Sequence, residues 1–369
     1  RQSGAFLGAL PDDWNVPGLD QSSGGPASSP SIDVSDLVLD AANTGQQTAV
    51  SVVGSVAKGS NRASGAFVKG VASQPLESDS HIGIAGDTAI NVAHEDTLAQ
   101  MSFTGQVTVL DQVEIQASNR TDFLAVSGAA AIAWNREAGQ KSSVAMTAAV
   151  ARNEIHLTTE SILSGQSPGQ NVAWTSGSLE MNADSTGVIF AVTAALGIAN
   201  VDDPAFALNV AFSLGWNELD ETVLTHIDDG DFSVAGSAGL SSENSREIHA
   251  DGGGAAFTLG ESKGVAVGIG TSTGFNDVQL TVDAAIRGGT LHARSLSIDA
   301  TANPLVQAWA LAGAGEFSRP TAGREKESIL DLQVAGALAF NSLSKLVATA
   351  RIERETAGSV TIVTQENLS

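Results

Sequence analysis

A repeat of about 64 residues is the feature that most constrains what this chain can fold into. Each unit carries a short strand-like label and, further along, an asparagine that follows a long alternating apolar run. The labels begin at Leu37, Val113, Leu179, Phe232, Leu296 and Val360, and the asparagines are Asn153, Asn217, Asn276 and Asn341. Self-similarity at a regular spacing predicts a repeat array in which each unit buries its apolar face on its neighbours.

The hydrophobic pattern within each unit has a period of two, which is the period of a β-strand. Between residues 205 and 216, one side of such a strand carries large apolar residues, and the other carries alanine, asparagine, serine and glycine. A second long strand precedes this one in each unit, for example in residues 123–134. The asparagines lie on the small-residue side, where they either form an internal amide ladder or end the strand in a left-handed conformation.

These patterns predict an all-β fold, a parallel β-solenoid built from the 64-residue repeats. If each repeat wraps as about three coils of roughly 21 residues, the chain makes about 15 coils. At about 4.8 Å per coil, such a stack is a rod about 70 Å long. The small-residue strand faces and the end coils would then allow close packing against other copies.

The chain divides at about residue 31. Residues 1–31 hold four of the nine prolines and a serine- and glycine-rich run, which predicts a linker or an extended N-terminal arm. The arm carries an apolar patch, residues 5–10, that can dock on the solenoid or on a neighbouring molecule, although a tether is the simpler interpretation. Residues 32–369 are assigned to the solenoid, with modules starting near residues 37, 113, 179, 232 and 296, and Glu95 takes the asparagine position of the irregular first module.

Net charge, apolar stretches and cysteine content limit the kinds of partner and environment that we expect for the chain. The formal net charge is -23, so neither nucleic acid nor an anionic membrane, both of which need a basic face, is an expected partner. The longest uncharged apolar stretch, residues 188–201, is too short for a membrane helix, and no membrane insertion is expected. The absence of cysteine fits a secreted bacterial repeat protein that is stabilised by stacking rather than by disulfides.

Acidic residues supply the best candidate for a bound ion. Asp228, Asp229 and Asp231 surround Gly230, and closely spaced carboxylates at a glycine turn suit Ca²⁺. The spacing is neither that of an EF-hand nor that of a calcium-binding β-roll, so a solvated turn is the simpler interpretation. The sequence indicates no cofactor other than this possible calcium ion.

No catalytic cluster emerges from the sequence. The string Gly270-Thr271-Ser272-Thr273-Gly274 matches a nucleophile elbow, but it lies inside an alternating strand rather than at a strand-to-helix turn. The six histidines have no metal-ligand spacing, and most charged residues fall in loops rather than on strand faces. We therefore expect a protein that is not an enzyme.

The pattern is clearest in three pieces of the chain. They are Gly274-Phe275-Asn276-Asp277-Val278, Leu296-Ser297-Ile298-Asp299-Ala300-Thr301-Ala302-Asn303-Pro304 and Ala308-Trp309-Ala310-Leu311-Ala312-Gly313-Ala314-Gly315. This patterning resembles the repeats of very large bacterial surface proteins, the leukotoxin-like filamentous adhesins and related giant β-helical exoproteins. The likeness covers about residues 37–369. It implies a right-handed β-solenoid that is exported and displayed on, or shed from, a bacterial surface.

The leading hypothesis is a non-enzymatic structural or adhesive segment of a bacterial extracellular or cell-surface protein that self-assembles into filaments. Assembly would use strand addition at the exposed ends or insertion of the arm into a neighbour. The expected partners are copies of the chain, flanking repeats of a longer chain, and a host or glycan receptor. The alternative is a carbohydrate-binding or carbohydrate-active β-solenoid, which a glycan array with a turnover assay would distinguish.

Overall fold

The computed structural model describes residues 2–7, 32–58, 80–103, 106–135, 141–165, 174–201, 204–260, 265–318, 330–353 and 361–363. Sheet A contains β1 (Gln2–Leu7), β4 (Ser80–Phe103), β7 (Lys141–Gly165), β10 (Pro204–Asp228), β13 (Val265–Arg287) and β17 (Leu330–Glu353). Sheet B contains β2 (Ile32–Val34), β5 (Val107–Val109), β8 (Trp174–Ser176), β11 (Asp231–Val234), β14 (Thr290–His292) and β18 (Thr361–Val363). Sheet C contains β3 (Leu37–Lys58), β6 (Gln112–Asn135), β9 (Ser178–Val201), β12 (Ser237–Gly260), β15 (Ser295–Ala302) and β16 (Leu305–Ser318).

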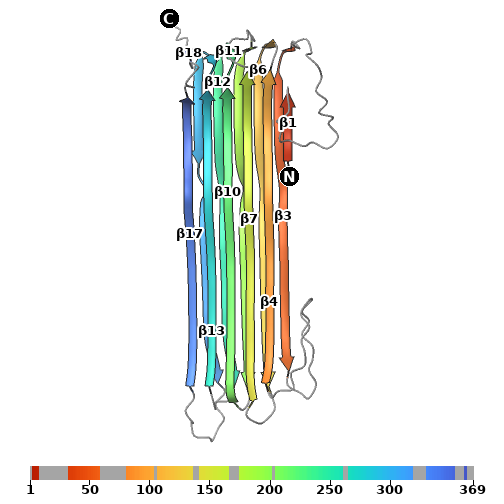
Figure 1. Cartoon of the computed structure of the whole chain (residues 1–369), viewed down its shortest axis with the longest axis vertical. Coiled ribbons are helices and arrows are strands. Elements are labelled where there is room, and N and C mark those ends of the chain that lie inside the picture. The colour runs from red at the N-terminus through yellow and green to blue at the C-terminus, as the bar shows by residue number, and fades with distance from the viewer. Residues whose placement is uncertain are drawn as a thin grey trace.

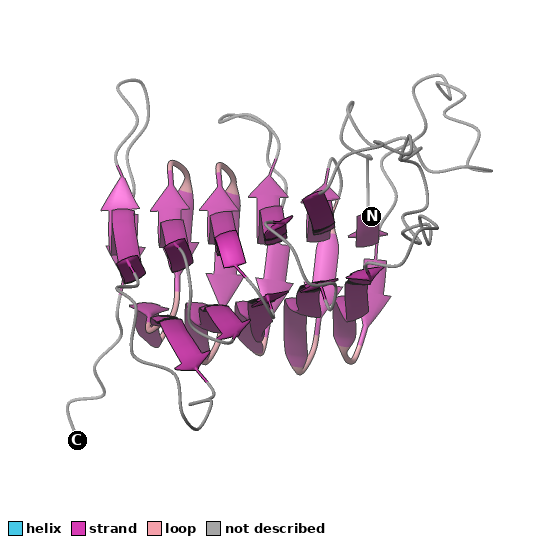
Figure 2. Ribbon diagram, turned by 90° about the horizontal axis from the view of Figure 1, so that it is seen from below, coloured by secondary structure: helices cyan, strands magenta, loops and turns pink. Residues whose placement is uncertain are grey.

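The chain winds through the three sheets in a constant order, from A to B to C and back to A. Every strand pairs in parallel with the equivalent strand of the next coil, as for β7 with β10 and for β6 with β9. The coils stack side by side in Figure 1, and Figure 2 shows the same stack from the end of the long strands. The predicted all-β parallel β-solenoid is therefore confirmed.

The size of each coil differs from the prediction. Thr158 pairs directly with Thr222, and Val113 pairs directly with Leu179, so residues one repeat apart occupy neighbouring coils. The prediction of three coils per repeat is wrong, because one repeat makes a single wide coil with two long strands. A strand of 24 residues such as β6 is about 80 Å long, whereas six stacked strands span only about 30 Å. The long axis of the molecule therefore follows the strands, which run vertically in Figure 1.

The asparagines do not end the strands. Asn153 lies in the middle of β7, and the same strand continues to Gly165. In the first module, Asn91 pairs with Asn153, whereas Glu95 pairs with Leu157. The assignment of Glu95 to the asparagine position is therefore wrong, and Asn91 occupies it.

The interior changes character along the strands. Where the strands of sheet C end and those of sheet A begin, the two sheets enclose clusters made almost entirely of alanine, such as Ala131, Ala149 and Ala211. Towards sheet B, the core contains larger side chains, among them Trp174 and Phe232. Small side chains let two sheets approach closely, whereas a third wall leaves a wider space that large residues must fill. We call the alanine-rich part the narrow half and the part closed by sheet B the wide half.

The small-residue side of the sheet A strands in the narrow half faces inward. On β10, Ala207, Ala211 and Ser213 are buried, while Phe212 is exposed on the outer face. The expectation that small-residue faces contact other copies is therefore corrected for these strands. In sheet A, the small residues form the interior, and the large apolar residues form the outer surface.

Residues 2–7 of the predicted arm form β1, which pairs with Asp96–Met101 at the edge of β4. Ala5 and Leu7 pack against the core of the wide half. The rest of the arm, residues 8–31, lies outside the described residues. Within that description, no helix is long and apolar enough to cross a lipid bilayer.

Candidate functional site

A ladder of buried amides runs through the stack at the boundary between the two halves. Each asparagine donates a hydrogen bond from its Nδ2 to Oδ1 of the asparagine in the next coil. The successive bonds are Asn91 to Asn153 (2.8 Å), Asn153 to Asn217 (2.7 Å), Asn217 to Asn276 (2.8 Å) and Asn276 to Asn341 (2.8 Å). Of the two structural roles that the sequence leaves open, the structure therefore shows the amide ladder.

The ladder also joins the two long sheets. The Nδ2 group of Asn153 donates to the Phe190 carbonyl at 3.0 Å, and that of Asn217 donates to the His249 carbonyl at 2.6 Å, both in sheet C. Asn153, Asn217 and Asn276 are fully buried, so each lost partner would cost about 1–3 kcal/mol. The ladder therefore aligns sheet A with sheet C as well as one coil with the next.

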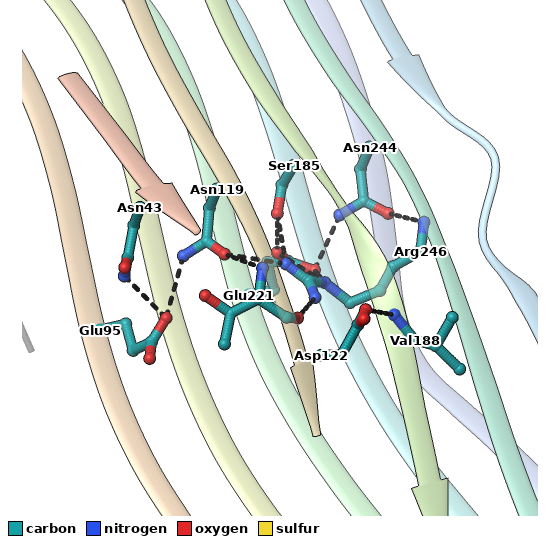
Figure 3. A network of polar contacts seen from close by, with 10 residues as sticks. Asn43, Glu95, Asn119, Asp122, Ser185, Val188, Glu221, Asn244 and Arg246 are labelled. Atoms are coloured by element: carbon teal, nitrogen blue, oxygen red, sulfur yellow. Dashed lines mark hydrogen bonds and ion pairs between the residues drawn. The ribbon is translucent and has the colours of Figure 1, made fainter. Parts of the chain in front are cut away.

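An ion pair lies inside the wide half. Arg246 of β12 and Glu221 of β10 both have fully buried side chains, and Nε of the arginine lies 3.2 Å from each carboxylate oxygen. The guanidinium also donates to the Thr121 carbonyl at 2.9 Å and to the Ser185 hydroxyl at 2.7 Å. Asn244 donates to the carboxylate at 2.7 Å, as drawn in Figure 3. These contacts compensate the loss of hydration of both charges.

Gly187 leaves the space that this arginine uses. Its φ angle is +120°, and an added Cβ would lie 2.7 Å from the Thr121 carbonyl oxygen and 3.0 Å from Nη1 of Arg246. Beside it, Asp122 accepts the backbone N–H of Val188 at 2.8 Å. Glycine therefore combines a backbone conformation that other residues rarely adopt with room for the guanidinium.

Two further buried carboxylates are held by neutral donors. Glu95 accepts Nδ2 of Asn43 at 2.7 Å and Nδ2 of Asn119 at 3.4 Å, at the left of Figure 3. Asp87 accepts the hydroxyl of Ser127 at 3.0 Å and a backbone N–H at 2.9 Å. Both carboxylates thus lie between the sheets, where their hydrogen bonds join sheet A to sheet C.

A histidine and two arginines surround Asp283 near sheet B. Burial, with the Arg287 charge beside it, lowers the pKa of His226 to about 4, so the imidazole is neutral at pH 7. The 3.4 Å separation of His226 Nε2 from the Asp283 carboxylate is therefore not an ion pair at that pH. Instead, Nη2 of Arg287 lies 2.9 Å from Nε2 of His226. Because the arginine can only donate, Nε2 of the neutral imidazole accepts this hydrogen bond. Arg287 and Arg351 contact the Asp283 carboxylate at 3.1 and 2.8 Å.

The acidic turn that the sequence singles out lies between sheets A and B. Asp228 ends β10, Asp229 has a φ angle of 48°, and Asp231 begins β11. The backbone of Asp229 hydrogen-bonds to the equivalent turns of both neighbouring coils, at Gly165 and Arg287. Across the described residues, no group of three or more histidine, aspartate or glutamate side chains is placed to hold a metal ion. Calcium binding at this turn stays a prediction.

Ser272 lies inside the protein rather than at an exposed turn. It is 1% exposed, and its hydroxyl accepts a hydrogen bond from Ser213 at 3.0 Å. A nucleophile elbow needs its serine exposed at a strand-to-helix turn, and Ser272 is buried in the middle of β13.

The outer face of sheet A is mainly apolar in the narrow half, with Thr88, Thr271 and Thr273 among its outward residues. We call it the A face and define it by the outward residues between positions 82–92 of β4, 144–152 of β7, 206–216 of β10, 265–275 of β13 and 330–340 of β17. Arg152 is the charged residue among these described positions, and its guanidinium lies over the Trp216 ring. Trp216, Phe275 and Phe340 form an aromatic row along the stack.

The outer face of sheet C in the narrow half is apolar too, but it is hollowed. A hollow of about 610 Å³ crosses β3, β6, β9, β12 and β16. Small residues make up much of its lining, among them Gly128, Ala130, Ala194, Gly253 and Gly313. The larger lining residues include Val52, Leu196, Phe257 and Leu311. We call this surface the C face.

The charged interior was not foreseen from the sequence. The signal was present, because Asn43, Asn119 and Asn244 fall on equivalent inward positions of β3, β6 and β12. In addition, Glu221 and Arg246 are inward residues of strands whose other inward residues are uncharged. A search restricted to turns and loops passes over such residues.

Comparisons of the chain with family models, with curated proteins and with solved structures find no match.

Proposed function

We propose that this chain is a non-enzymatic structural or adhesive segment of a bacterial extracellular or cell-surface protein, of the kind that the resemblance to leukotoxin-like filamentous adhesins implies. In this proposal the coil stack extends end to end, as each new coil pairs in parallel with the last one. The partner is a second copy of the chain or a flanking repeat.

The observation that carries the proposal is the pair of long strand edges at the two ends of the stack. Among the described residues, β17 of sheet A has a neighbour on one side, and so does β3 of sheet C. Such edges present rows of backbone N–H and C=O groups that favour pairing with another strand. Their length of 24 and 22 residues makes them suited to extended parallel pairing.

The amide ladder matches at the two ends. In the described structure, Asn341 donates from Nδ2 to the Val306 carbonyl at 3.4 Å, which leaves its second Nδ2 hydrogen facing beyond β17. At the opposite end, Asn91 donates to Asn153, while its Oδ1 is an acceptor facing away from the stack. A second copy stacked in register would join these two groups and continue the ladder.

β1 supports strand addition and also limits it. Its pairing with Asp96–Met101 means that the β4 edge accepts a parallel strand. In a stack of two copies, β17 of one copy would pair with β4 of the next and would compete with β1 along those six residues. Removal of residues 1–7 should therefore accelerate end-to-end assembly.

The non-enzymatic part of the proposal is supported by the position of the carboxylates. Glu95, Glu221 and Asp283 are buried between the sheets and hydrogen-bonded to other groups of the protein. A catalytic carboxylate must reach a substrate, and these carboxylates instead join strands.

Electron microscopy and light scattering of the purified chain test the proposal. The wild type should form filaments with a reflection near 4.8 Å along the filament axis, from stacked strands. Ala337 of β17 faces inward but is exposed at the end of the stack, so Ala337→Lys should block filaments by placing a charge in the next interface. The matched control, Val347→Lys, points outward on the same strand and should assemble normally. A wild type that stays monomeric at high concentration, or equal assembly of the two variants, contradicts the proposal.

A further inference from the structure

The narrow half has an apolar surface on both of its outer sides. On the A face, Ile84 is 57% exposed, Leu338 is 61% exposed and Phe340 is 51% exposed. With five strands about 4.8 Å apart and 11 residues of about 3.3 Å each, this face covers about 900 Å². The largest apolar patch on a typical monomer is about 300–600 Å², and a stable interface needs about 800 Å² per partner. The A face is therefore large enough for a specific interface.

The shapes of the two faces are complementary. On the A face, Phe212, Leu214 and Trp216 project outward from the central strand β10. On the C face, the hollow of about 610 Å³ is lined mostly by glycine and alanine and lies across the central strand β9. Large residues continue along the stacking direction in the rows of Val210 and Trp216, because Val210 pairs with Met146 and Ile269 and Trp216 pairs with Phe275. Phe212 pairs with Ala148 and Thr271, so it projects from a row of smaller residues. The hollow also crosses successive strands along the stacking direction. Large side chains of the A face would fill the hollow.

We propose that the A face of one copy packs on the C face of a second copy, with sheets face to face about 10 Å apart. This inference rests on the proposed function in one respect, that copies of the chain associate, and it adds a second direction of association. The two faces lie on opposite sides of the same pair of sheets. The contact therefore does not close on itself, and each copy binds two lateral neighbours in an open row.

Two other arrangements of the same surfaces are less favourable. Packing of one A face on another would leave the hollow of the C face open to water. A lipid surface would cover one face of each copy and leave the opposite apolar face exposed. When the A face of each copy packs on the C face of the next copy, both apolar surfaces of every interior copy in the row are covered.

The experiment uses the full chain with Ala337→Lys, which removes end-to-end assembly, so that failure of this inference is separated from failure of the proposed function. Sedimentation velocity of this parent should show oligomers that grow beyond the dimer with concentration. Phe212→Lys on the A face, or Ala194→Lys on the C face, should each weaken association by about 30-fold or more, because a charge lies at the centre of the contact. The matched controls, Thr222→Lys on β10 and Asn182→Lys on β9, lie outside the two faces and should behave as the parent does.

A mixture of the two face variants gives the decisive result. The Phe212→Lys chain keeps an intact C face, and the Ala194→Lys chain keeps an intact A face, so an equimolar mixture should form a dimer that grows no further. Misfolding cannot produce this gain of association. The inference is overturned if the parent is monomeric, if Ala194→Lys associates as the parent does, or if the mixture stays monomeric. It is also overturned if the parent binds phosphatidylcholine vesicles through the A face without self-association.

Discussion

The buried ion pair of Arg246 and Glu221 gives a prediction whose size follows from the structure. Arg246→Met removes the cation and leaves a fully buried carboxylate without its charged partner. It also removes the donors to the Thr121 carbonyl and to the Ser185 hydroxyl. Removal of one partner of a buried pair costs about 3–5 kcal/mol, and we expect Arg246→Met to lower the free energy of unfolding by that amount.

The companion variant, Glu221→Gln, should cost about 3 kcal/mol, because it leaves a buried guanidinium next to a neutral amide. The double variant should cost much less than the sum of the two, because no uncompensated charge remains once Arg246 and Glu221 are both replaced. Urea unfolding followed by circular dichroism and by tryptophan fluorescence measures all three. Urea is used because a salt denaturant would screen the charges under study.

An exposed ion pair supplies the control. Arg152 and Glu218 lie 3.0 Å apart with side chains 34% and 39% exposed, so Arg152→Met should cost less than about 1 kcal/mol. If the costs of the Arg246 and Glu221 variants add within about 0.5 kcal/mol, the two charges are not coupled. A cost of Arg246→Met no larger than that of Arg152→Met would also refute the reasoning.

Three further predictions concern single positions. His226 binds a proton below about pH 4 in the folded state and near pH 6.5 when unfolded, so folding stability should fall as the pH drops through this window, by about 2–3 kcal/mol at pH 4.5. His226→Asn should remove that share of the pH dependence, measured as the free energy of unfolding in urea at several pH values. If the free energy of unfolding changes with pH as steeply in the variant as in the wild type, His226 is not the group responsible. Gly187→Ala should cost about 2 kcal/mol or more through its φ of +120° and its crowded Cβ, whereas Gly54→Ala, with open space around the new methyl group, should change stability by less than about 0.5 kcal/mol. Asn217→Ala should cost about 2–4 kcal/mol in thermal or urea unfolding, and Asn341→Ala, at the exposed end of the same ladder, less than about 1 kcal/mol. Equal costs at the two asparagines would argue against a stabilising ladder.

The strand content and the parallel stacking could be predicted, because period-two alternation and repeated labels are local properties of the sequence. The size of the coil could not be predicted in the same way. Alternation does not report where a strand ends, and the long run before Asn153 continues after it with larger inward residues such as Ile155 and Leu157. The sequence left open whether the asparagine ends the strand, whereas in the structure the strand continues past it into the part of the interior that widens towards sheet B.

The alternating pattern also could not predict which side of each strand faces the interior. Alternation shows that Phe212 and Ser213 lie on opposite sides of a strand, but the usual preference of large apolar residues for the core would put Phe212 inside. In the narrow half, both long sheets carry small residues on facing sides, and a close approach of the sheets leaves no room for phenylalanine. The shape of the partner sheet therefore decides which side is buried, and a single strand does not carry that information.

A disulfide between two positions one repeat apart tests the central claim, that each repeat forms one wide coil. Thr158 and Thr222 pair in register on neighbouring strands, and the chain has no cysteine of its own. Parallel neighbours lie about 4.8 Å apart, within the Cα separation that a disulfide spans. Thr158→Cys with Thr222→Cys should therefore form an intramolecular disulfide in the folded protein, detected by mass spectrometry without reductant. Thr158→Cys with Glu180→Cys, 22 residues apart, should stay reduced. The opposite result, a disulfide in the second pair and free thiols in the first, would contradict the one-coil repeat.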